Sequence, residues 1–101
     1  MKELKVGVMG AGRIGHVHAT NLTNFIPGVR VKTIADPYMT DNARKWIKAL
    51  GIENVSENHQ DILEDPEIDA VLICSSTNTH ARFSRESAQA GKDIFCEKPI
   101  D

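Results

Sequence analysis

The sequence of 101 residues lacks the features that mark several classes of protein. It has no run of 18 or more apolar residues, which argues against a transmembrane helix, and its N-terminus has no signal-peptide pattern. Its basic residues form no cluster and the net charge is −2, so nothing indicates a nucleic-acid or anionic-membrane partner. We therefore expect a cytoplasmic protein that binds neither nucleic acid nor membranes.

Cysteine is scarce, and its positions exclude two kinds of site. Cys74 and Cys96 form no C-x-x-C pair, and the cysteines and histidines do not have the spacing of a zinc site. We expect no metal, and we expect both thiols to be small buried hydrophobic groups in a reducing compartment.

The chain also lacks repeats, low-complexity tracts and linkers, and its length suits a single domain. Short apolar runs rich in β-branched residues alternate with helical patterns, an order that favours βαβ units and a parallel sheet. The sequence thus predicts a doubly wound α/β domain over residues 1–101, with five strands and four intervening helices. The predicted strands are Leu4 to Met9, Val29 to Ala35, Asn54 to Ser56, Asp69 to Cys74, and Asp93 to Cys96.

Apolar spacing predicts which side of the first helix faces the sheet. The helix begins near Arg13 and stops at Pro27-Gly28. The residues expected on its inner face are Ile14, Val17, His18, Leu22 and either Phe25 or Ile26.

Capping residues predict the limits of the later helices. Thr40 is a suitable N-cap for the second helix and Gly51 a suitable residue after its end. Asn58 or Asp61 starts a short third helix, and Thr79 caps the fourth, which closes at Gly91. The inner face of the second helix is expected to carry Ala43, Trp46, Ile47 and Leu50.

A glycine motif separates the first strand from the first helix. Residues 10–15 read G-x-G-x-x-G, a pattern that is weak evidence alone but strong between an apolar strand and an amphipathic helix. Gly10 permits the tight turn, Gly12 lets a pyrophosphate approach the backbone, and Gly15 lets helix and strand pack closely. The helix N-terminus then offers free N–H groups to the phosphates. The motif predicts a dinucleotide site in a Rossmann-type fold, whose complete form has a sixth strand.

An acidic residue stands where this motif requires one. Asp36 lies 21 residues after Gly15, at the end of the second strand, where a carboxylate accepts hydrogen bonds from the adenosine ribose. It would also repel a 2′-phosphate, and the next residue is Pro37 rather than a neutralising arginine. The sequence therefore favours NAD over NADP.

Two neighbours of this site have two interpretations each. Tyr38 either lies against the adenine or is a half-exposed aromatic residue of the loop. Arg13 either covers the pyrophosphate or points to water from the start of the helix.

Polar residues follow the fourth and fifth strands, whose carboxyl ends are where open α/β sheets bind ligands. Ser75 to Thr79 offer small hydroxyl and amide groups, and they also suit a loop that caps the next helix. Among the four histidines, His80 alone is placed near this edge as a functional candidate, since His18 is expected to pack and His59 to start a helix. Lys98 would stabilise negative charge or transfer a proton beside a reacting hydroxyl, although such a residue is also common in solvated loops.

Together these segments resemble the glucose–fructose oxidoreductase and inositol dehydrogenase family, and within it the myo-inositol 2-dehydrogenases. The resemblance runs along the whole chain, and its ending is more specific than the glycine motif. It is carried by residues 10–15, His18-Ala19, Asn21-Leu22, Asp36, Ser76 to His80, Ala90-Gly91-Lys92 and Glu97-Lys98-Pro99.

The resemblance implies a role for each matching residue. Lys98 would be the catalytic lysine, and the peptide bond between Lys98 and Pro99 would be cis. Glu97 would lie near the nicotinamide. The residues implied to contact NAD are Gly10, Ala11, Gly12, Arg13, Ile14, Asp36, Pro37, Tyr38, Ser75, Ser76, Thr77, Asn78, His80, Glu97 and Lys98.

Members of this family continue into a second domain that supplies the substrate pocket and an Asp and a His for proton transfer. We therefore expect this chain to be the cofactor domain of a longer enzyme that oxidises a cyclic polyol or sugar, and to bind NAD without turnover by itself. Because the sixth strand is missing, we expect the fifth to be an edge at which Ile94 and Phe95 lose cover and copies self-associate. A non-catalytic module that senses NAD(H) and a structural remnant are the alternatives.

Overall fold

The structure is a computed structural model that describes residues 3–74 and 77–96. Strands and helices alternate along the chain, as the sequence predicts. In chain order the elements are β1 (Leu4–Met9), α1 (Arg13–Phe25), β2 (Val29–Ala35), α2 (Asp41–Ala49), β3 (Asn54–Ser56), α3 (Gln60–Leu63), β4 (Ala70–Ile73), α4 (Thr77–Gln89) and β5 (Asp93–Cys96).

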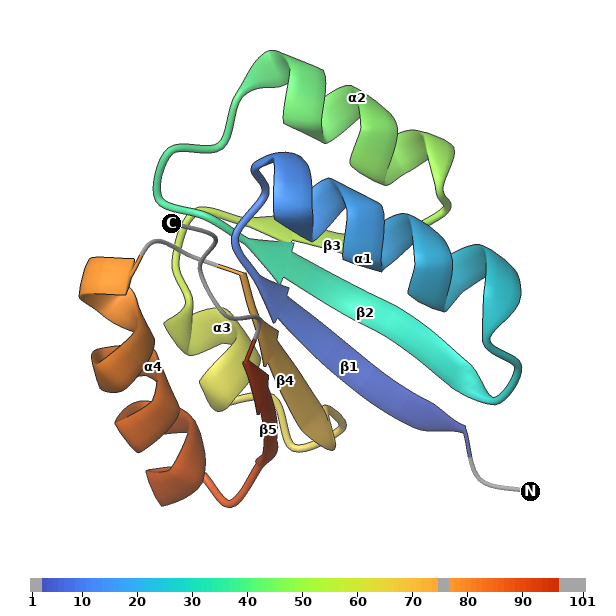
Figure 1. Ribbon diagram of the computed structural model, residues 1–101. Helices are drawn as coiled ribbons and strands as arrows, with labels where there is room; N and C mark the ends of the chain where they lie inside the picture. Colours follow the sequence, from blue (N-terminus) through green and yellow to red (C-terminus); the bar gives the residue numbers. More distant parts are fainter. Residues whose placement is uncertain (1–2, 75–76, 97–101) are drawn as a thin grey trace.

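The five strands form one parallel sheet in the order β3-β2-β1-β4-β5. Helices α1 and α2 cover one face of the sheet, and α3 and α4 cover the other (Figure 1). The order reverses at β1, because the chain moves outward to β3 and then crosses back to β4. This is the predicted doubly wound fold, and it places the switch point of the sheet between β1 and β4.

Each face of the sheet has its own hydrophobic cluster. Under α1 and α2, Val8 and Ile34 pack with Ile47, and all three side chains are fully buried. On the other face, Ile62 of α3 and Phe83 of α4 pack with Val71 and Ile73 of β4, among others. Strand β4 contributes to both clusters, which explains its continuous apolar sequence.

The predicted inner face of α1 is partly wrong. Val17, Phe25 and Ile26 are exposed, with 49%, 73% and 44% of their surface accessible, whereas the buried residues of the helix are Gly15 and Ala19. The helix docks through its smallest side chains, since these let its axis approach the sheet closely. Apolar periodicity gives most weight to large side chains and so wrongly included Val17 and Phe25, whereas the predicted Ile14, His18 and Leu22 are half-buried beside Gly15 and Ala19.

The limits of α2 agree with the prediction, whereas the start of α4 does not. Thr40 accepts a hydrogen bond at its Oγ1 from the Ala43 N–H at 3.0 Å, and Gly51 has a φ of +77° after the helix. Helix α4 begins at Thr77, so Thr79 lies inside its first turn and is not the N-cap. Every Ser, Thr and Asn in this segment suits a cap, and the local pattern does not select among them.

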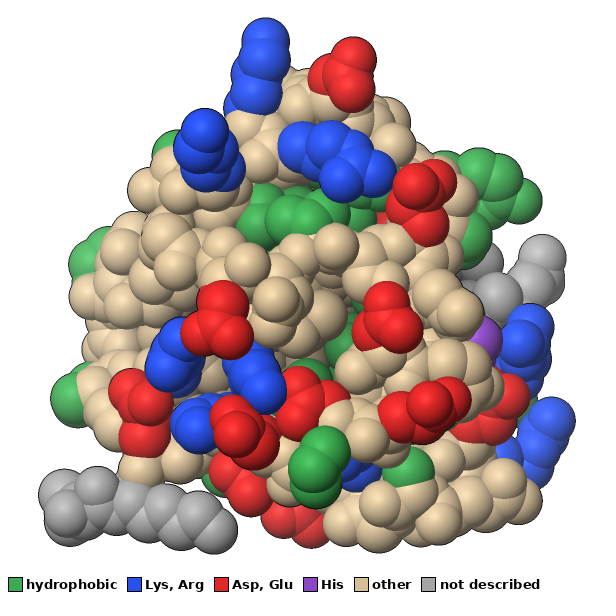
Figure 2. Space-filling model, turned by 180° about the vertical axis from the view of Figure 1, so that it is seen from behind, with side chains coloured by type: hydrophobic (Ala, Val, Ile, Leu, Met, Phe, Trp, Pro, Cys, Tyr) green, Lys and Arg blue, Asp and Glu red, His purple; other side chains and the backbone are tan. Residues whose placement is uncertain are grey.

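A cluster of charged side chains joins strands to the loop before β4. The Lys32 Nζ donates to Asp65 Oδ2 at 2.6 Å and to Glu67 Oε1 at 3.0 Å, and the Lys5 Nζ donates to the same Glu67 oxygen at 3.2 Å. The Lys92 Nζ donates to the backbone oxygens of Asp65 and Ile68, both at 2.8 Å. Figure 2, which views the molecule from behind relative to Figure 1, shows acidic and basic side chains interspersed on the lower part of the surface. The cluster ties β1, β2 and the start of β5 to one loop.

The Lys32 pairs predict how stability varies with pH. The hydrogen bond with Lys32 lowers the pKa of both Asp65 and Glu67, and the two carboxylates raise the pKa of Lys32. A lowered carboxyl pKa gives stability above the unfolded value of about 4, and this stability is lost as the pH falls through the folded value. The raised lysine pKa gives stability that is lost only as the pH rises beyond about 10.4.

We expect Lys32→Met to lower the free energy of unfolding between pH 5 and 9, and we expect the difference from wild type to shrink as the pH falls below about 4 through the lowered pKa of the two carboxylates. Urea unfolding at pH 3 and pH 7 measures the difference. Lys45→Met, in an exposed residue of α2, is the control. An equal loss of stability at both pH values would show that the cluster is not ionic in effect.

Candidate dinucleotide site

The turn after β1 has the backbone geometry that the glycine motif predicts. Gly10 has a φ of +118°, a conformation that L side chains rarely adopt. Its N–H donates to the Ala35 oxygen at 2.8 Å, and the Cys74 N–H donates to the Met9 oxygen at 2.8 Å. These bonds hold the carboxyl ends of β1, β2 and β4 together at the edge of the sheet where the turn lies.

Gly12 and Gly15 meet opposite surroundings. A Cβ added to Gly15 would lie 2.1 Å from the backbone oxygen of Gly10, so no larger residue fits between α1 and the turn. A Cβ added to Gly12 would meet no atom within 4 Å. Gly12 is also the N-cap of α1 and has no side chain to accept from the first-turn N–H groups. The start of α1 therefore presents backbone donors to open space, and a phosphate fits this arrangement.

Asp36 links the glycine turn to the end of β2. Its Oδ2 accepts a hydrogen bond from the Ala11 N–H at 2.8 Å, and its Oδ1 accepts one from the Tyr38 N–H at 2.8 Å. The side chain is half-buried, and two backbone groups fix its orientation. A carboxylate has further lone pairs, so Asp36 can still accept from the hydroxyl groups of a ribose.

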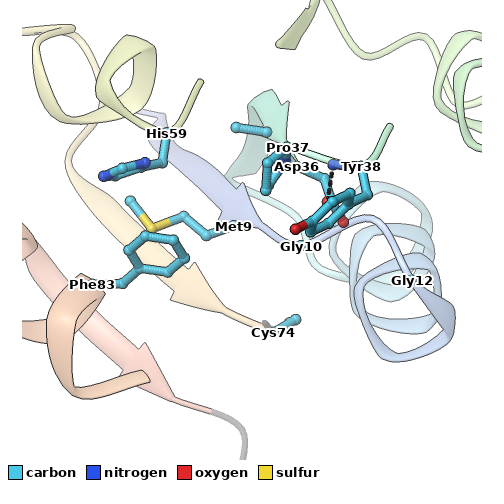
Figure 3. A pocket seen from close by; sticks show the side chains of 10 residues that line it. Met9, Gly10, Gly12, Asp36, Pro37, Tyr38, His59, Cys74 and Phe83 are labelled. Carbon is cyan, nitrogen blue, oxygen red and sulfur yellow. Dashed lines mark hydrogen bonds between the residues drawn. The ribbon is translucent and has the colours of Figure 1, made fainter. Parts of the chain in front are cut away.

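A cavity of about 330 Å³ opens beside Asp36, between the ends of the strands and α4 (Figure 3). Its walls are mainly apolar, which suits a flat heteroaromatic base more than a charged group. Gly12 and Asp36 lie on its border, so a base in the cavity would have its ribose near the carboxylate. The lining residues are Met9, Gly10, Gly12, Ala35, Asp36, Pro37, Tyr38, His59, Cys74 and Phe83.

Five of these lining residues were missed as site residues in the sequence, namely Met9, Ala35, His59, Cys74 and Phe83. Met9 and Cys74 stand at the carboxyl ends of β1 and β4, and this position was the signal that could have identified them. His59 begins α3, as predicted, but its ring also packs 4.5 Å from that of Phe83, and its Nε2 lies 2.9 Å from Glu86 Oε2. Phe83 carries no such signal, because its spacing in α4 is that of an ordinary core residue.

The two uncertain neighbours are both exposed. Tyr38 has 86% of its surface accessible and stands at the rim of the cavity, where a bound base could cover it. Arg13 is exposed at the first position of α1. Of the other predicted contacts, Ala11 is half-buried in the turn, Ile14 is half-buried at the start of α1, and Pro37 is exposed on the border of the cavity. Cys74 is half-buried rather than fully buried, because it forms part of the cavity wall.

A second pocket, of about 430 Å³, lies between the N-terminal parts of α1 and α2. In it the His16 ring stacks on the Trp46 indole, with centroids 4.1 Å apart and planes 9° from parallel. Gly12, Asp36 and Tyr38 border both this pocket and the first cavity. The remaining lining residues are Ala11, Arg13, His16, Thr40, Asn42, Ala43 and Trp46.

The structure describes only part of the polar segments that follow β4 and β5. Strands β4 and β5 are parallel neighbours, with Ile73 paired to Cys96, so their carboxyl ends meet at one edge as predicted. Thr77, Asn78 and His80 belong to the first turn of α4, near that edge. Ser75, Ser76, Glu97, Lys98 and the predicted cis bond between Lys98 and Pro99 lie outside the described residues.

Within residues 3–74 and 77–96, no group of three or more His, Cys, Asp or Glu side chains could hold a metal ion. None of the helices in this part of the chain is long and apolar enough to cross a membrane.

Comparison with known proteins agrees with this geometry. Residues 4–101 match the model of an oxidoreductase family with an NAD-binding Rossmann fold. The chain is 41% identical over 98 residues to scyllo-inositol 2-dehydrogenase (NAD(+)) of Bacillus subtilis, and 42% identical over 97 residues to myo-inositol 2-dehydrogenase of Thermotoga maritima. These alignments cover 97% and 96% of the chain but 28% of each relative, so the chain spans a little over a quarter of their length.

A solved structure gives the same relation. Scyllo-inositol dehydrogenase of Lactobacillus casei, with bound cofactor NAD(H) and scyllo-inositol, superposes with a TM-score of 0.87 at 34% identity. The match covers 97% of this chain and 28% of that one.

Proposed function

The chain belongs to the oxidoreductase family with an NAD-binding Rossmann fold, and we propose that it is the cofactor domain of an NAD-dependent inositol or related polyol dehydrogenase. The observation that carries this proposal is the junction of Asp36 with the glycine turn. The fixed Asp36 carboxylate stands between an apolar cavity and the uncapped N-terminus of α1. The adenosine diphosphate half of the cofactor needs these three groups, for its base, its ribose and its pyrophosphate.

The described residues fit NAD in a defined order. The adenine enters the cavity between Met9, Phe83 and His59, with Tyr38 able to cover it from the rim. The ribose hydroxyls donate to Asp36. The pyrophosphate approaches Gly12 and the backbone donors of α1, with Arg13 beside it. Gly10, Ala11, Ile14 and Pro37 complete the walls of this half of the site.

The nicotinamide half belongs at the carboxyl ends of β4 and β5, where Ser75, Ser76, Thr77, Asn78, His80 and Glu97 would line the groove. When bound, the nicotinamide supplies the acceptor for a hydride from a secondary alcohol carbon. Lys98 would hold the hydroxyl group and take its proton, so the products are a ketone, NADH and a proton. The relatives named above act on inositols, and we extend this substrate class to the whole protein of which the chain is the cofactor domain.

Binding of NAD by the chain itself is the test of this proposal. Titration with NAD, NADH and NADP should raise the melting temperature with NAD and NADH, and much less with NADP. A ligand at one hundred times its dissociation constant stabilises the folded state by about 2.7 kcal/mol, which is a shift of several degrees for a domain of this size. If none of the three ligands moves the melting temperature, the groove is not a dinucleotide site in this chain.

Turnover by the chain alone should be negligible, because it spans little more than a quarter of the relatives' length and the substrate must also be held. Inositol added with NAD should give no increase in NADH absorbance under conditions where NAD binds. Inositol-dependent NADH production would show that the substrate site is already present.

Self-association through β5 is a further part of the proposal. Strand β5 is the last of the described sheet, and Phe95 on it has 58% of its surface accessible, while Ile94 is half-buried against the second cluster. An edge strand with an exposed aromatic residue is a surface that other chains can pair with. Sedimentation velocity should show oligomers whose fraction rises with concentration and falls in Phe95→Lys. A monomer at all concentrations would contradict this.

A further inference from the structure

We infer that His59 recognises the 6-amino group of the adenine, and that Glu86 sets the ring nitrogen with which it does so. The cavity beside Asp36 is then specific for adenine over hypoxanthine, the base in which a carbonyl oxygen replaces the amino group. This inference rests on the proposed binding of NAD in that cavity, and adds to it a choice between bases.

The two ends of the cavity carry different polar side chains. Asp36 follows β2, whereas His59 immediately precedes α3, and in Figure 3 the two lie at opposite walls with the Met9 side chain between them. In adenosine, the ribose bond and the 6-amino group are at opposite ends of the base. A base whose ribose donates to Asp36 therefore directs its amino group toward the wall that His59 forms.

His59 is suited to hydrogen-bond a base at this wall. Its neighbours there, Met9 and Phe83, are apolar, and the Tyr38 side chain is exposed at the rim. The His59 side chain has 15% of its surface accessible, so water reaches little of the ring. A polar group removed from water costs free energy unless it finds a partner, and a bound adenine supplies one.

Glu86 determines which nitrogen of His59 carries the proton. The His59 Nε2 lies 2.9 Å from Glu86 Oε2, and the Arg82 Nε lies 3.5 Å from the same oxygen. An ionised carboxylate only accepts hydrogen bonds, so Nε2 is the donor in this pair. A neutral imidazole has a single N–H, and Nδ1 therefore keeps its lone pair as an acceptor. Within the described residues, nothing else is hydrogen-bonded to the ring.

The orientation of the ring is fixed by α4. The centroid of the His59 ring lies 4.5 Å from that of Phe83, with the planes 42° apart, and the Arg82 guanidinium carbon lies 5.7 Å from the Phe83 centroid. Because the Nε2 edge of the imidazole faces α4, its Nδ1 edge faces away from α4, toward the side of the cavity where Asp36 lies (Figure 3). The acceptor is thus in place before a base enters.

The chemistry of the two bases then decides between them. The 6-amino group of adenine donates a hydrogen bond to Nδ1. The 6-oxygen of hypoxanthine is itself an acceptor, so two lone pairs face each other and both remain without a donor. A site built to bond an N–H group rejects an analogue that lacks it far more strongly than an apolar pocket rejects a change of shape.

The experiment compares NAD with nicotinamide hypoxanthine dinucleotide by calorimetric titration of the chain at pH 8. We expect NAD to bind at least about tenfold more tightly. ADP and IDP should show a similar ratio, because they differ in the same group and lack the nicotinamide half. Equal affinities within each pair would overturn the inference.

His59→Phe tests the acceptor, because phenylalanine keeps a ring beside Phe83 but has no nitrogen. The ratio of the two dissociation constants should fall close to one, mainly through weaker binding of NAD. A ratio that stays at the wild-type value in the folded variant would show that another group distinguishes the bases.

Two variants of Glu86 test its positioning role. In Glu86→Leu the proton of His59 is free to move to Nδ1, which can then donate to the carbonyl oxygen of hypoxanthine, so the ratio should fall. Glu86→Gln should keep most of it, since the amide oxygen still accepts from Nε2. Arg85→Gln is the matched control, because Arg85 is exposed on α4 and does not line the cavity. If Glu86→Leu weakens both dinucleotides equally, Glu86 supports the fold and does not set the acceptor.

The outcomes separate this inference from the proposed function. Failure of wild type to bind either dinucleotide would overturn the proposed function. Normal binding of NAD, with hypoxanthine accepted equally well, would overturn the role of His59 alone. The comparison of ligands in wild type needs no variant, so it decides the matter even where a substitution prevents folding.

Discussion

Gly12→Ala should abolish detectable NAD binding while leaving the free energy of unfolding within about 1 kcal/mol of wild type. The added Cβ meets no protein atom within 4 Å, and Gly12 has a φ of −80°, which alanine adopts readily. The same Cβ would occupy the open space in front of α1 through which a pyrophosphate must approach the backbone. The loss therefore comes from blocked contact and not from disturbed folding.

Calorimetric titration with NAD, together with urea unfolding of the same preparation, measures the two quantities separately. The affinity should fall by about 100-fold or more, since several hydrogen bonds to charged phosphate oxygens are lost together. Gly28→Ala, in the turn before β2 and away from the site, is a control for NAD affinity only, because its φ of +82° makes alanine there destabilising. If Gly12→Ala binds NAD like wild type, the pyrophosphate does not lie at this turn.

Gly15→Ala, unlike Gly12→Ala, should mainly affect stability, and we expect it to lower the free energy of unfolding by about 3 kcal/mol or more. Its Cβ would lie 2.1 Å from the Gly10 oxygen and 3.0 Å from the Gly10 carbon, and both are backbone atoms that cannot move as a side-chain tip can. To accept the methyl group, α1 must move off the sheet, and the buried contacts of Ala19 and Leu22 weaken with it. A loss of this size is a large part of the stability of a small domain.

Urea unfolding monitored by Trp46 fluorescence and by circular dichroism measures this effect, and the Gly12→Ala protein is the matched control from the same turn. NAD binding should also weaken in Gly15→Ala, but only in parallel with the loss of structure. An unchanged unfolding midpoint would mean that α1 is not packed against the turn as closely as the structure has it.

The sequence by itself determined the strands of this protein. Strands β1, β2, β3 and β5 have the predicted limits, and β4 is shorter by one residue at each end. Short runs of β-branched residues, separated by turn residues and helix caps, are local signals, and local signals can be read along one chain. The same holds for the position of Asp36, since the end of β2 and the glycine motif lie at known distances in the sequence.

The packing face of α1 was decided by tertiary structure. Burial of Gly15 and Ala19 in place of Val17 and Phe25 depends on how closely the helix approaches the sheet, and this distance is not encoded in apolar periodicity. The start of α4 at Thr77 could not be predicted from the local pattern either, because several adjacent residues suit a cap.

Only the tertiary structure assembled the walls of the two pockets. His59 and Phe83 come from α3 and α4, and His16 and Trp46 come from α1 and α2, so no spacing in the sequence relates them. The glycine turn and Asp36 could be predicted because one short strand–turn–helix–strand unit contains both. The surfaces that would hold the base, and those behind the carboxylate, could not, because they form only when helices distant in the chain pack on the two faces of one sheet.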